Sequence, residues 1–387
     1  MIHKMKSLFF LLLLSFFCLP GQAFTLSDNA EISILTCSPG TELYSLFGHT
    51  AIRIHDPKNH YDQVFNYGTF DFQTPHFYLK YAQGLLPYQL TNTSFRNFMN
   101  AYLSEERSVF AQKLKLDSMQ KQTLFDLLLD NSREENRFYL YNFLFDNCTT
   151  RSRDILLKST SGKIEWRMAD TGKNFWNLLD EYLQVSPWVQ WGIHTILGQR
   201  GNRRATPFQY MFLPDYLMSG LTTAHYNGIQ LAENTEIIYQ APKPEINNPW
   251  YRNPLFIFAA GAALLIFALC KLKNKILLNT LTLILFLFTG ILGCLIVFLG
   301  GFTAHPITAP NWNILWANPL NLIALFFLLK KSIPRFIFIY LNIYLTLLIT
   351  AIPVWLFARP AVPFASISLI ILMFYISLQH RKKYTSV

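Results

Sequence analysis

The last third of this chain lacks acidic residues. All 23 Asp and Glu residues lie between Asp28 and Glu245, and the more than 130 residues after Pro254 contain none. Residues 24–250 contain 20 Lys and Arg against those 23 acids, so this part is slightly acidic although the whole chain carries a net charge of +10. The positive excess lies at the N-terminus and around apolar runs. This placement excludes a nucleic-acid-binding surface as its explanation.

Motifs for metal and nucleotide binding are also missing. The sequence has no paired-Cys or His-Glu-x-x-His spacing and no glycine-rich phosphate loop. Cysteine is scarce, with five in the chain, and three of them, Cys18, Cys270 and Cys294, lie in apolar runs. Only Cys37 and Cys148 are left for chemistry outside those runs. Thiol chemistry needs no cofactor, and we expect neither a cofactor nor a metal.

Residues 1–23 have the features of a secretory signal peptide. Lys4 and Lys6 precede an apolar run from Leu8 to Leu19, and Gly21-Gln22-Ala23 offers small residues for cleavage. Phe17 is too large for a lipoprotein acylation site at the following cysteine. We therefore expect residues 24–250 to be exported.

Residues 251–387 contain five apolar runs of the length needed to cross a membrane, at 254–270, 276–299, 314–329, 336–357 and 361–378. The third run is the shortest and would also suit a re-entrant hairpin. The count of basic residues favours five spans. With five spans, the connections between the runs on one side of the membrane hold only Arg359. The opposite set holds nine: Lys271, Lys273, Lys275, Lys330, Lys331, Arg335, Arg381, Lys382 and Lys383.

This charge bias predicts how the protein is oriented in its membrane. The basic side is cytoplasmic and includes the C-terminus, so residues 24–250 and the loop Gly301–Asn318 face outward. The loop carries His305, Trp312 and Trp316. We interpret its aromatic residues as a belt at the membrane interface.

The exported part is predicted to be an α+β domain. Three runs have strand character, residues 32–37, 50–55 and 63–67, and the last two flank a turn of Asp56-Pro57-Lys58-Asn59. Helical patterns follow at residues 77–81, 95–103 and 118–129, with Asp117 as an N-cap. Asp146 and Asn147 then cap a further helix that begins at Cys148.

Cys148 is the candidate nucleophile. A helix N-terminus lowers the pKa of a thiol through the helix dipole and its free amides, which favours the thiolate. Cys37 ends an apolar strand and resembles a small core residue. The alternative hypothesis is a disulfide between Cys37 and Cys148, because exported compartments are oxidising.

His49 is the candidate base, since Gly48 before it permits a close approach at the start of a strand. A turn centred between Pro57 and Lys58 pairs residues whose numbers sum to 115, and it places Asn66 opposite His49. Asn66 could then accept the second imidazole N–H and complete a Cys, His, Asn arrangement. Because the register could slip, Asp62 and Asp71 are substitutes for this third position.

Three sequence blocks resemble the Lnb N-terminal periplasmic domain family: Glu42–Arg53, Phe65–Phe72 and Tyr141–Arg151. The resemblance implies a permuted papain-like fold of the NlpC and lecithin-retinol acyltransferase type, in which the catalytic His precedes the Cys. His49 before Cys148 fits that order. The resemblance also implies a bacterial inner (cytoplasmic) membrane, with residues 24–250 on its periplasmic face. It also implies a lipoprotein N-acyltransferase, which takes a fatty acyl chain from a membrane phospholipid and transfers it to the free α-amine of a lipidated N-terminal cysteine.

Two other interpretations stay open. The same Cys and His would serve a membrane-anchored hydrolase, acting on cell-wall peptides or amides or on lipids. A disulfide would instead make the domain a non-catalytic envelope protein. For an acyltransferase the partners are a phospholipid donor, a lipoprotein acceptor and the membrane, and no nucleic acid.

Other groups near the predicted site could bind substrate. The backbone N–H of Cys148 is one plausible oxyanion donor. Arg53 and Arg107 are candidate phosphate-binding residues, although an exposed Arg is more often solvated or ion-paired. Tyr44 and Tyr67 flank the site, where packing or hydrogen bonding is the commoner role for a tyrosine.

Overall fold

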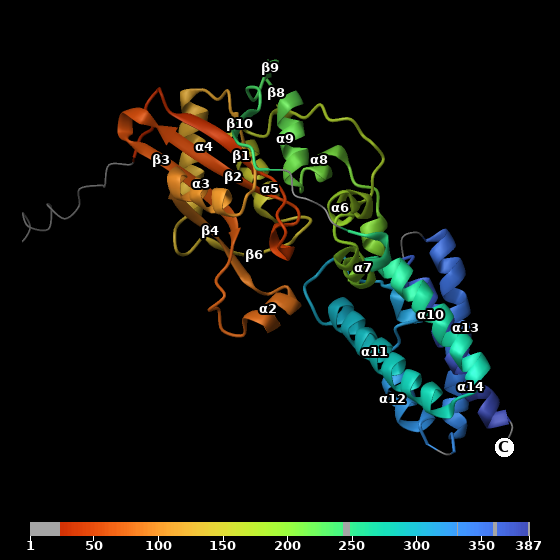
Figure 1. Ribbon diagram of the computed structural model, residues 1–387. Helices are drawn as coiled ribbons and strands as arrows, with labels where there is room; N and C mark the ends of the chain where they lie inside the picture. The colour runs from red at the N-terminus through yellow and green to blue at the C-terminus, as the bar shows by residue number, and fades with distance from the viewer. Residues whose placement is uncertain (1–23, 243–247, 331, 359–361, 386–387) are drawn as a thin grey trace, which may run out of the picture.

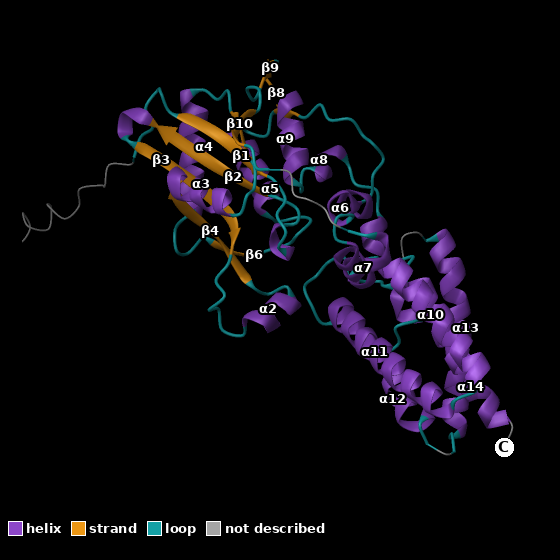
Figure 2. Ribbon diagram, in the orientation of Figure 1, coloured by secondary structure: helices purple, strands orange, loops and turns teal. Residues whose placement is uncertain are grey.

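A computed structural model describes residues 24–242, 248–330, 332–358 and 362–385 (Figures 1 and 2). The predicted signal peptide and Arg359 lie outside the described residues. The chain forms an α+β domain followed by a body of helices, which Figure 2 separates clearly by colour. The predicted division into these two classes of structure is therefore confirmed.

A seven-stranded antiparallel sheet forms the centre of the first domain, in the order β10-β5-β1-β2-β3-β4-β6. Its strands in chain order are β1 (Glu31–Cys37), β2 (His49–Asp56), β3 (Tyr61–Thr69), β4 (Pro87–Ser94), β5 (Val109–Lys113), β6 (Phe138–Leu140) and β10 (Glu236–Tyr239). A small second sheet consists of β7 (Ile164–Glu165), β8 (His225–Tyr226) and β9 (Ile229–Gln230).

Helices cover both faces of the large sheet. On one face, α4 (Ser118–Asn131) and α5 (Cys148–Ser159) pack over a core that includes Ile34 and Ile52. On the other face, α3 (Phe95–Ser104) packs against alternate residues of the same strands. This alternation follows from the two-residue period of a strand, and it buries the central strands on both sides.

The predicted elements of this domain are present. Each strand or helix for which a range was predicted contains that range and extends it by at most two residues at either end, whereas the later strands β4–β10 and the helices after α5 were not predicted. Asp117 caps α4 through a reciprocal capping box with Gln120. Local signals therefore identified these elements well, since capping residues and apolar periodicity depend on near neighbours in the sequence.

The predicted register of the β2–β3 hairpin is wrong by two residues. Asp56 pairs with Tyr61, because the turn contains Pro57–Asn59 and also His60, whose φ is 53°. The numbers of paired residues therefore sum to 117 rather than 115. A shift of two residues keeps every side chain on its predicted face, so Asn66 stays on the face it was expected to occupy.

Further helices lie beside the sheet, and some of them lie between it and the helical body (Figure 1). They are α6 (Phe175–Leu183), α7 (Pro187–Ile196), α8 (Pro207–Tyr210) and α9 (Pro214–Thr223), and 3-10 turns occur at Leu43–Ser45, Gln199–Asn202 and Trp250–Arg252. A short helix, α2 (Phe77–Gln83), stands apart in the connection between β3 and β4.

Three helices of the second body are long and apolar enough to cross a membrane: α10 (Pro254–Leu272), α11 (Lys275–Gly301) and α13 (Arg335–Phe357). A further helix is α14 (Ser366–Thr385). The third predicted span forms a 3-10 turn, Trp312–Leu315, and α12 (Leu320–Leu328). Nine helical residues rise only about 14 Å, half of the roughly 30 Å of a hydrocarbon core.

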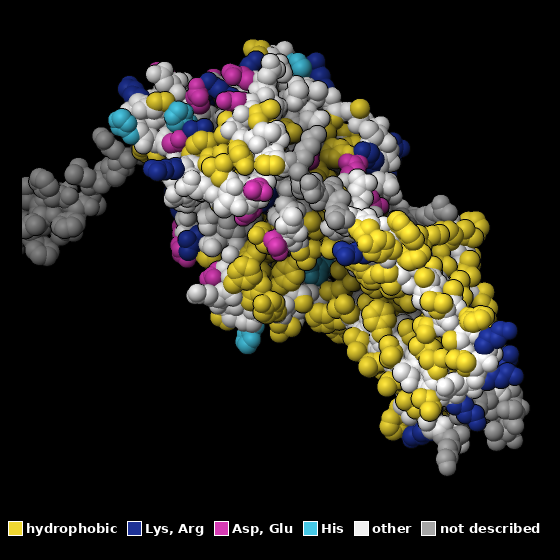
Figure 3. Space-filling model, viewed as in Figure 1, with side chains coloured by type: hydrophobic (Ala, Val, Ile, Leu, Met, Phe, Trp, Pro, Cys, Tyr) yellow, Lys and Arg dark blue, Asp and Glu magenta, His cyan; other side chains and the backbone are white. Residues whose placement is uncertain are grey.

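The alternating direction of the helices α10 to α14 nevertheless agrees with five crossings of the membrane. Figure 1 places the end of α12, the start of α13 and the end of α14 together, at the end of the helical body far from the sheet. Lys and Arg side chains gather at that same end (Figure 3). The number of spans stays a prediction, and the short α12 is the segment on which it depends.

The prediction of an aromatic belt in the loop 301–318 is wrong for Trp316. Its indole is fully buried among the helices, and its N–H donates to the side-chain oxygen of Asn313 at 2.8 Å. The loop also bonds to the first domain, because Gly198 N–H donates to Ile307 O at 2.7 Å. We conclude that this loop joins the two bodies, in addition to the chain connection near residue 250.

Labelling of introduced cysteines tests the five-span topology. In a variant whose native cysteines are replaced by alanine, Phe302→Cys should react with a membrane-impermeant maleimide from the outer face. Lys330→Cys should react only after the membrane is permeabilised, because α12 brings the chain to the cytoplasmic side. Reaction of Lys330→Cys from outside would contradict five spans and favour the re-entrant hairpin.

Candidate active site

The start of α5 is held by an unusually complete cap. Asn147 is the N-cap, and its side-chain oxygen accepts hydrogen bonds from the N–H groups of Thr149 and Thr150, both at 2.9 Å. The Thr150 hydroxyl accepts the Asn147 N–H at 2.8 Å in return. These contacts use the donors of the second and third helical residues. The N–H of Cys148, at the first position, has no intrahelical acceptor and faces the helix start.

The same asparagine fixes the helix to two loops. Its side-chain NH₂ donates to the carbonyl oxygens of Phe143 at 2.7 Å and Phe212 at 2.8 Å. Asn147 is only 2% exposed, and all of its amide capacity is used. The position of the following residue, Cys148, is therefore fixed by contacts with the loop just before the helix and with a distant loop at Phe212.

Cys148 has an acidified thiol. Burial, which leaves the residue 9% exposed, raises the pKa, but the positive charge and a hydrogen bond of His49 lower it. Hydrogen bonds from the Thr50 N–H and the Thr149 hydroxyl, 3.8 Å from Sγ, lower it further. The net result is a pKa of about 7. A large fraction of the thiol is then the nucleophilic thiolate at neutral pH.

His49 is the first residue of β2, and its ring is oriented by Asn66. The Nε2 atom lies 3.3 Å from the side-chain oxygen of Asn66, which can only accept, so Nε2–H donates. The Asn66 NH₂ donates to Val64 O at 3.5 Å, which fixes the orientation of the amide. The other ring nitrogen, Nδ1, is left to exchange a proton with the thiol.

Two glycines let the strands approach the helix start. Gly48 has a φ of +78°, and a Cβ there would lie 2.7 Å from the carbonyl oxygen of Cys37. Gly68 has a φ of +87°, and a Cβ there would lie 3.5 Å from the Cβ of Cys148. Since L side chains rarely adopt these conformations, glycine at both positions keeps His49 and β3 close to the thiol.

The disulfide hypothesis does not describe this structure, because Cys37 and Cys148 are both free. Cys37 is fully buried in the cluster under α3, together with Leu35 and Ala51, while Cys148 belongs to the cluster under α4 and α5. Burial raises the pKa of the Cys37 thiol to about 12. Cys37 is thus a core residue that stays protonated, as its apolar strand suggested.

Arg53 lies four residues beyond His49 on β2, about 13 Å along the strand. Its guanidinium forms two hydrogen bonds with Asp62, both at 2.8 Å, and stacks 3.5 Å from the centre of the Phe95 ring. Asp62 is therefore engaged away from His49. Asp71, the other proposed substitute for Asn66, accepts the N–H of Gln73 in a turn.

The remaining predicted binding residues are dispersed. Arg107 is 5% exposed and donates to Ser38 O at 2.9 Å and to Glu105 at 2.8 Å. Tyr67 is 1% exposed, and its hydroxyl accepts the side-chain NH₂ of Asn131 at 2.7 Å. Tyr44 is 65% exposed. The structure thus brings together Cys148, His49 and Asn66, and substrate binding by the other four stays a prediction.

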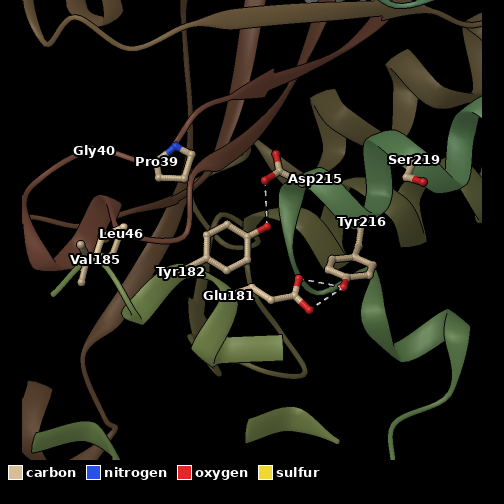
Figure 4. Close-up of a pocket in the computed structure, with 9 residues that line it drawn as sticks. All are labelled: Pro39, Gly40, Leu46, Glu181, Tyr182, Val185, Asp215, Tyr216 and Ser219. Atoms are coloured by element: carbon tan, nitrogen blue, oxygen red, sulfur yellow. Dashed lines mark hydrogen bonds between the residues drawn. The ribbon is translucent and has the colours of Figure 1, made fainter. Parts of the chain in front are cut away.

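A cavity of about 510 Å³ lies between the loop that precedes β2, the end of α6 and the start of α9, and it was not foreseen from the sequence (Figure 4). Within it, the Tyr182 hydroxyl donates to Asp215 at 2.8 Å, and burial raises the pKa of that carboxyl group. The Tyr216 hydroxyl donates to Glu181 at 2.9 Å. The lining comes from distant segments: Pro39, Gly40, Leu46, Glu181, Tyr182, Val185, Asp215, Tyr216 and Ser219.

Comparison with models of known protein families shows which family this chain belongs to. The profile of the Lnb N-terminal periplasmic domain matches residues 22–181, and that of the Lnb transmembrane domain matches residues 246–384. The chain belongs to the Lnb family. No curated protein and no solved structure matches it.

Membership in the Lnb family confirms the resemblance found in the three sequence blocks, all of which lie inside the N-terminal match. It makes this a membrane-embedded protein with a periplasmic N-terminal domain. The family indicates a membrane-anchored enzyme that modifies lipoproteins. Residues 182–245, which include α7 and α9, fall between the two Lnb matches.

Alkylation at different pH values tests the thiol. Reaction of Cys148 with iodoacetamide should rise with a midpoint near pH 7. In His49→Ala the midpoint should move upward, because burial then acts without the opposing charge. By linkage, the lowered pKa stabilises the fold at high pH, and this stabilisation is lost as the pH falls through about 7. Cys37 is an internal control that should stay unmodified. An unchanged midpoint in His49→Ala would contradict the His49–Cys148 contact.

Substitution of Asn66 tests the orientation of His49. Asn66→Ala removes the acceptor for Nε2–H, so the rate of Cys148 acylation should fall by about 10- to 100-fold, the usual effect of losing such an orienting contact. Asn66→Asp retains an acceptor and should keep more activity. Single-turnover acylation measures both variants. Equal rates for the native protein and Asn66→Ala would remove Asn66 from the catalytic group.

Proposed function

We propose that this protein is a thiol acyltransferase that moves a fatty acyl chain from a membrane phospholipid to the α-amine of the lipidated N-terminal cysteine of lipoproteins. The observation that carries the proposal is the contact between the acidified thiol of Cys148 and the imidazole of His49, itself oriented by Asn66. This group is built into a domain of a membrane-anchored, lipoprotein-modifying family. A cofactor has no role in the proposed chemistry.

In the first half-reaction, the Cys148 thiolate attacks the carbonyl carbon of a phospholipid acyl ester. The N–H of Cys148, at the open start of α5, is placed to donate to the oxyanion that forms. When the C–O bond breaks, His49 gives its proton to the departing alkoxide of the lysophospholipid. The products are a thioester on Cys148 and a neutral imidazole.

In the second half-reaction, the neutral α-amine of the lipoprotein attacks the thioester carbonyl. His49 takes a proton from the attacking nitrogen, the C–S bond breaks, and Cys148 leaves as the thiolate. The imidazolium so formed stabilises that thiolate, which restores the starting charge distribution. An α-amine has a pKa of about 8, so part of it is neutral at the pH where Cys148 is ionised.

The membrane domain suits this chemistry because donor and acceptor are both anchored in the outer leaflet. A site held at that surface meets both by diffusion in two dimensions. A hydrolase would use the same thioester with water as the acceptor, so the alternative of an NlpC-like hydrolase acting on cell-wall peptides, amides or lipids differs in the second half-reaction.

Mass spectrometry of N-terminal lipopeptides tests the proposal. Cells that lack their usual N-acyltransferase should gain one acyl chain on these peptides when they produce this protein. Cys148→Ala and His49→Ala should leave the peptides diacylated, because each variant loses a reacting group. Immunoblots should confirm equal amounts of the proteins in the membrane.

Cys37→Ala is the matched control, because it removes the other thiol of the exported domain, and it should retain acyl transfer. Diacylated peptides with the native protein, at normal expression, would contradict acyl transfer. Cell-wall fragments would then become the substrates to test.

A further inference from the structure

The connection between β3 and β4 exposes a dense group of aromatic and aliphatic side chains. We call residues 70–86 the aromatic arm. The arm contains α2 and projects from the end of the sheet toward the helical body (Figure 1). Asp71 and Lys80 are its only Asp, Glu, Lys or Arg residues. Its exposed large apolar residues, with their exposed fractions, are Phe72 (67%), Tyr78 (82%), Leu79 (54%), Tyr81 (51%) and Leu85 (45%).

The arm is fixed to the outer end of the membrane helices. The N–H of Ala304 donates to Gln83 O at 2.8 Å, and the His305 ring hydrogen-bonds to Ala82 O at 3.1 Å. These two loop residues follow shortly after α11, the longest of the membrane helices, which ends at Gly301. Phe302, directly after that helix, is 72% exposed. The arm therefore lies where the apolar surface of the membrane helices ends.

The space-filling view agrees with this placement. Figure 3 shows the hydrophobic surface over α2 continuing into the hydrophobic surface of the helical body, whereas the rest of the sheet domain carries mixed charge. A patch of this kind on a water-exposed face would be a liability for solubility. Aromatic side chains with polar tips, such as Tyr78 and Tyr81, are favoured at the boundary between lipid head groups and acyl chains.

A row of aromatic rings leads from the arm to the nucleophile. Phe70, at the base of the arm, lies 5.2 Å from Tyr88, measured between ring centres, and Tyr88 stacks on Tyr141 at 4.3 Å. Tyr141 in turn borders Gly68, since a Cβ on Gly68 would lie 3.6 Å from that ring and 3.5 Å from the Cβ of Cys148. The aromatic contacts thus continue from the arm to Tyr141, which lies beside Gly68 and Cys148.

We propose that the aromatic arm lies in the outer leaflet of the membrane and forms the side on which a phospholipid acyl chain enters the site of Cys148. The occupant of this surface is lipid, because the arm continues the apolar surface of helices that cross the same membrane. The identity of the cargo rests on the proposed acyltransferase function. The contact of the arm with lipid does not.

Fluorescence of a labelled arm tests the contact. In full-length protein with the native cysteines replaced by alanine, Leu79→Cys is labelled with a polarity-sensitive nitrobenzoxadiazole dye and reconstituted into phosphatidylcholine vesicles. Its emission should shift to the blue and be quenched by lipids brominated on the acyl chains, as for a label at Leu264→Cys, which lies in the middle of α10 and is 68% exposed. The control is Met119→Cys on α4, which is 79% exposed and outside the arm, and it should show neither effect.

A label at Leu79→Cys that behaves like the label at Met119→Cys would overturn the lipid contact. It would leave the patch as a surface for another protein. This result does not depend on activity, because the labelled protein lacks Cys148. Failure of the arm proposal and failure of the acyltransferase proposal are therefore distinguishable.

Acylation with two donors tests the entry role. Tyr78→Asp combined with Leu79→Asp should reduce thioester formation from vesicle phospholipid by about tenfold or more, since two charges oppose insertion into the leaflet. With a water-soluble short-chain ester the rate should stay unchanged, because that donor needs no route from the membrane. Met119→Asp is the matched control, with native rates for both donors.

Equal losses with both donors would indicate a damaged active site, and no loss with vesicles would indicate a different entrance. Either result would overturn the entry role. If the native protein forms no thioester with either donor, the acyltransferase proposal fails, and the fluorescence result still decides the position of the arm.

Discussion

The side chain of Asn147 is the constraint on which the site depends. One buried amide accepts two N–H groups of the first turn of α5 and donates to carbonyls in two separate loops. The cap opens the helix with a free amide at Cys148, while the loop contacts keep that end against the sheet. The position of the thiol is thus set by how the helix begins, and His49 and the hydrogen bonds from Thr50 and Thr149 lower the pKa of a sulfur that is already in place.

Much of the site could be predicted because its signals are local. Capping residues before Cys148, a glycine before His49 and a strand pattern containing Asn66 each depend on neighbours in the sequence. The link between His49 and Asn66 was predicted from a register that is wrong by two residues. The contact is still present because the error preserved the face of the sheet, and the imidazole reaches Asn66 diagonally rather than directly across.

The rest could not be predicted, because it depends on contacts between distant residues. The sequence suggests that Arg53 is an exposed cation, but its guanidinium bonds to Asp62 and stacks on the Phe95 ring. Trp316 has the position of an interfacial anchor, yet it is buried among helices. The cavity beside Asp215 combines three separate stretches of the chain. Periodicity and composition do not determine which segments meet, so none of these features has a signal within a short window.

The loop 301–318 has a mechanical consequence. Backbone hydrogen bonds with Gly198, Gln199 and Gln83, and a bond from the His305 ring to Ala82 O at the end of α2, join the sheet domain to the membrane helices at two separate places. A domain joined only by a linker would swing and sample many heights above the bilayer. The sheet domain is instead held at two places, which keeps Cys148 at one height above the bilayer and in one orientation. In the proposed reaction, lipid-anchored substrates would therefore have to diffuse in the plane of the membrane to reach Cys148.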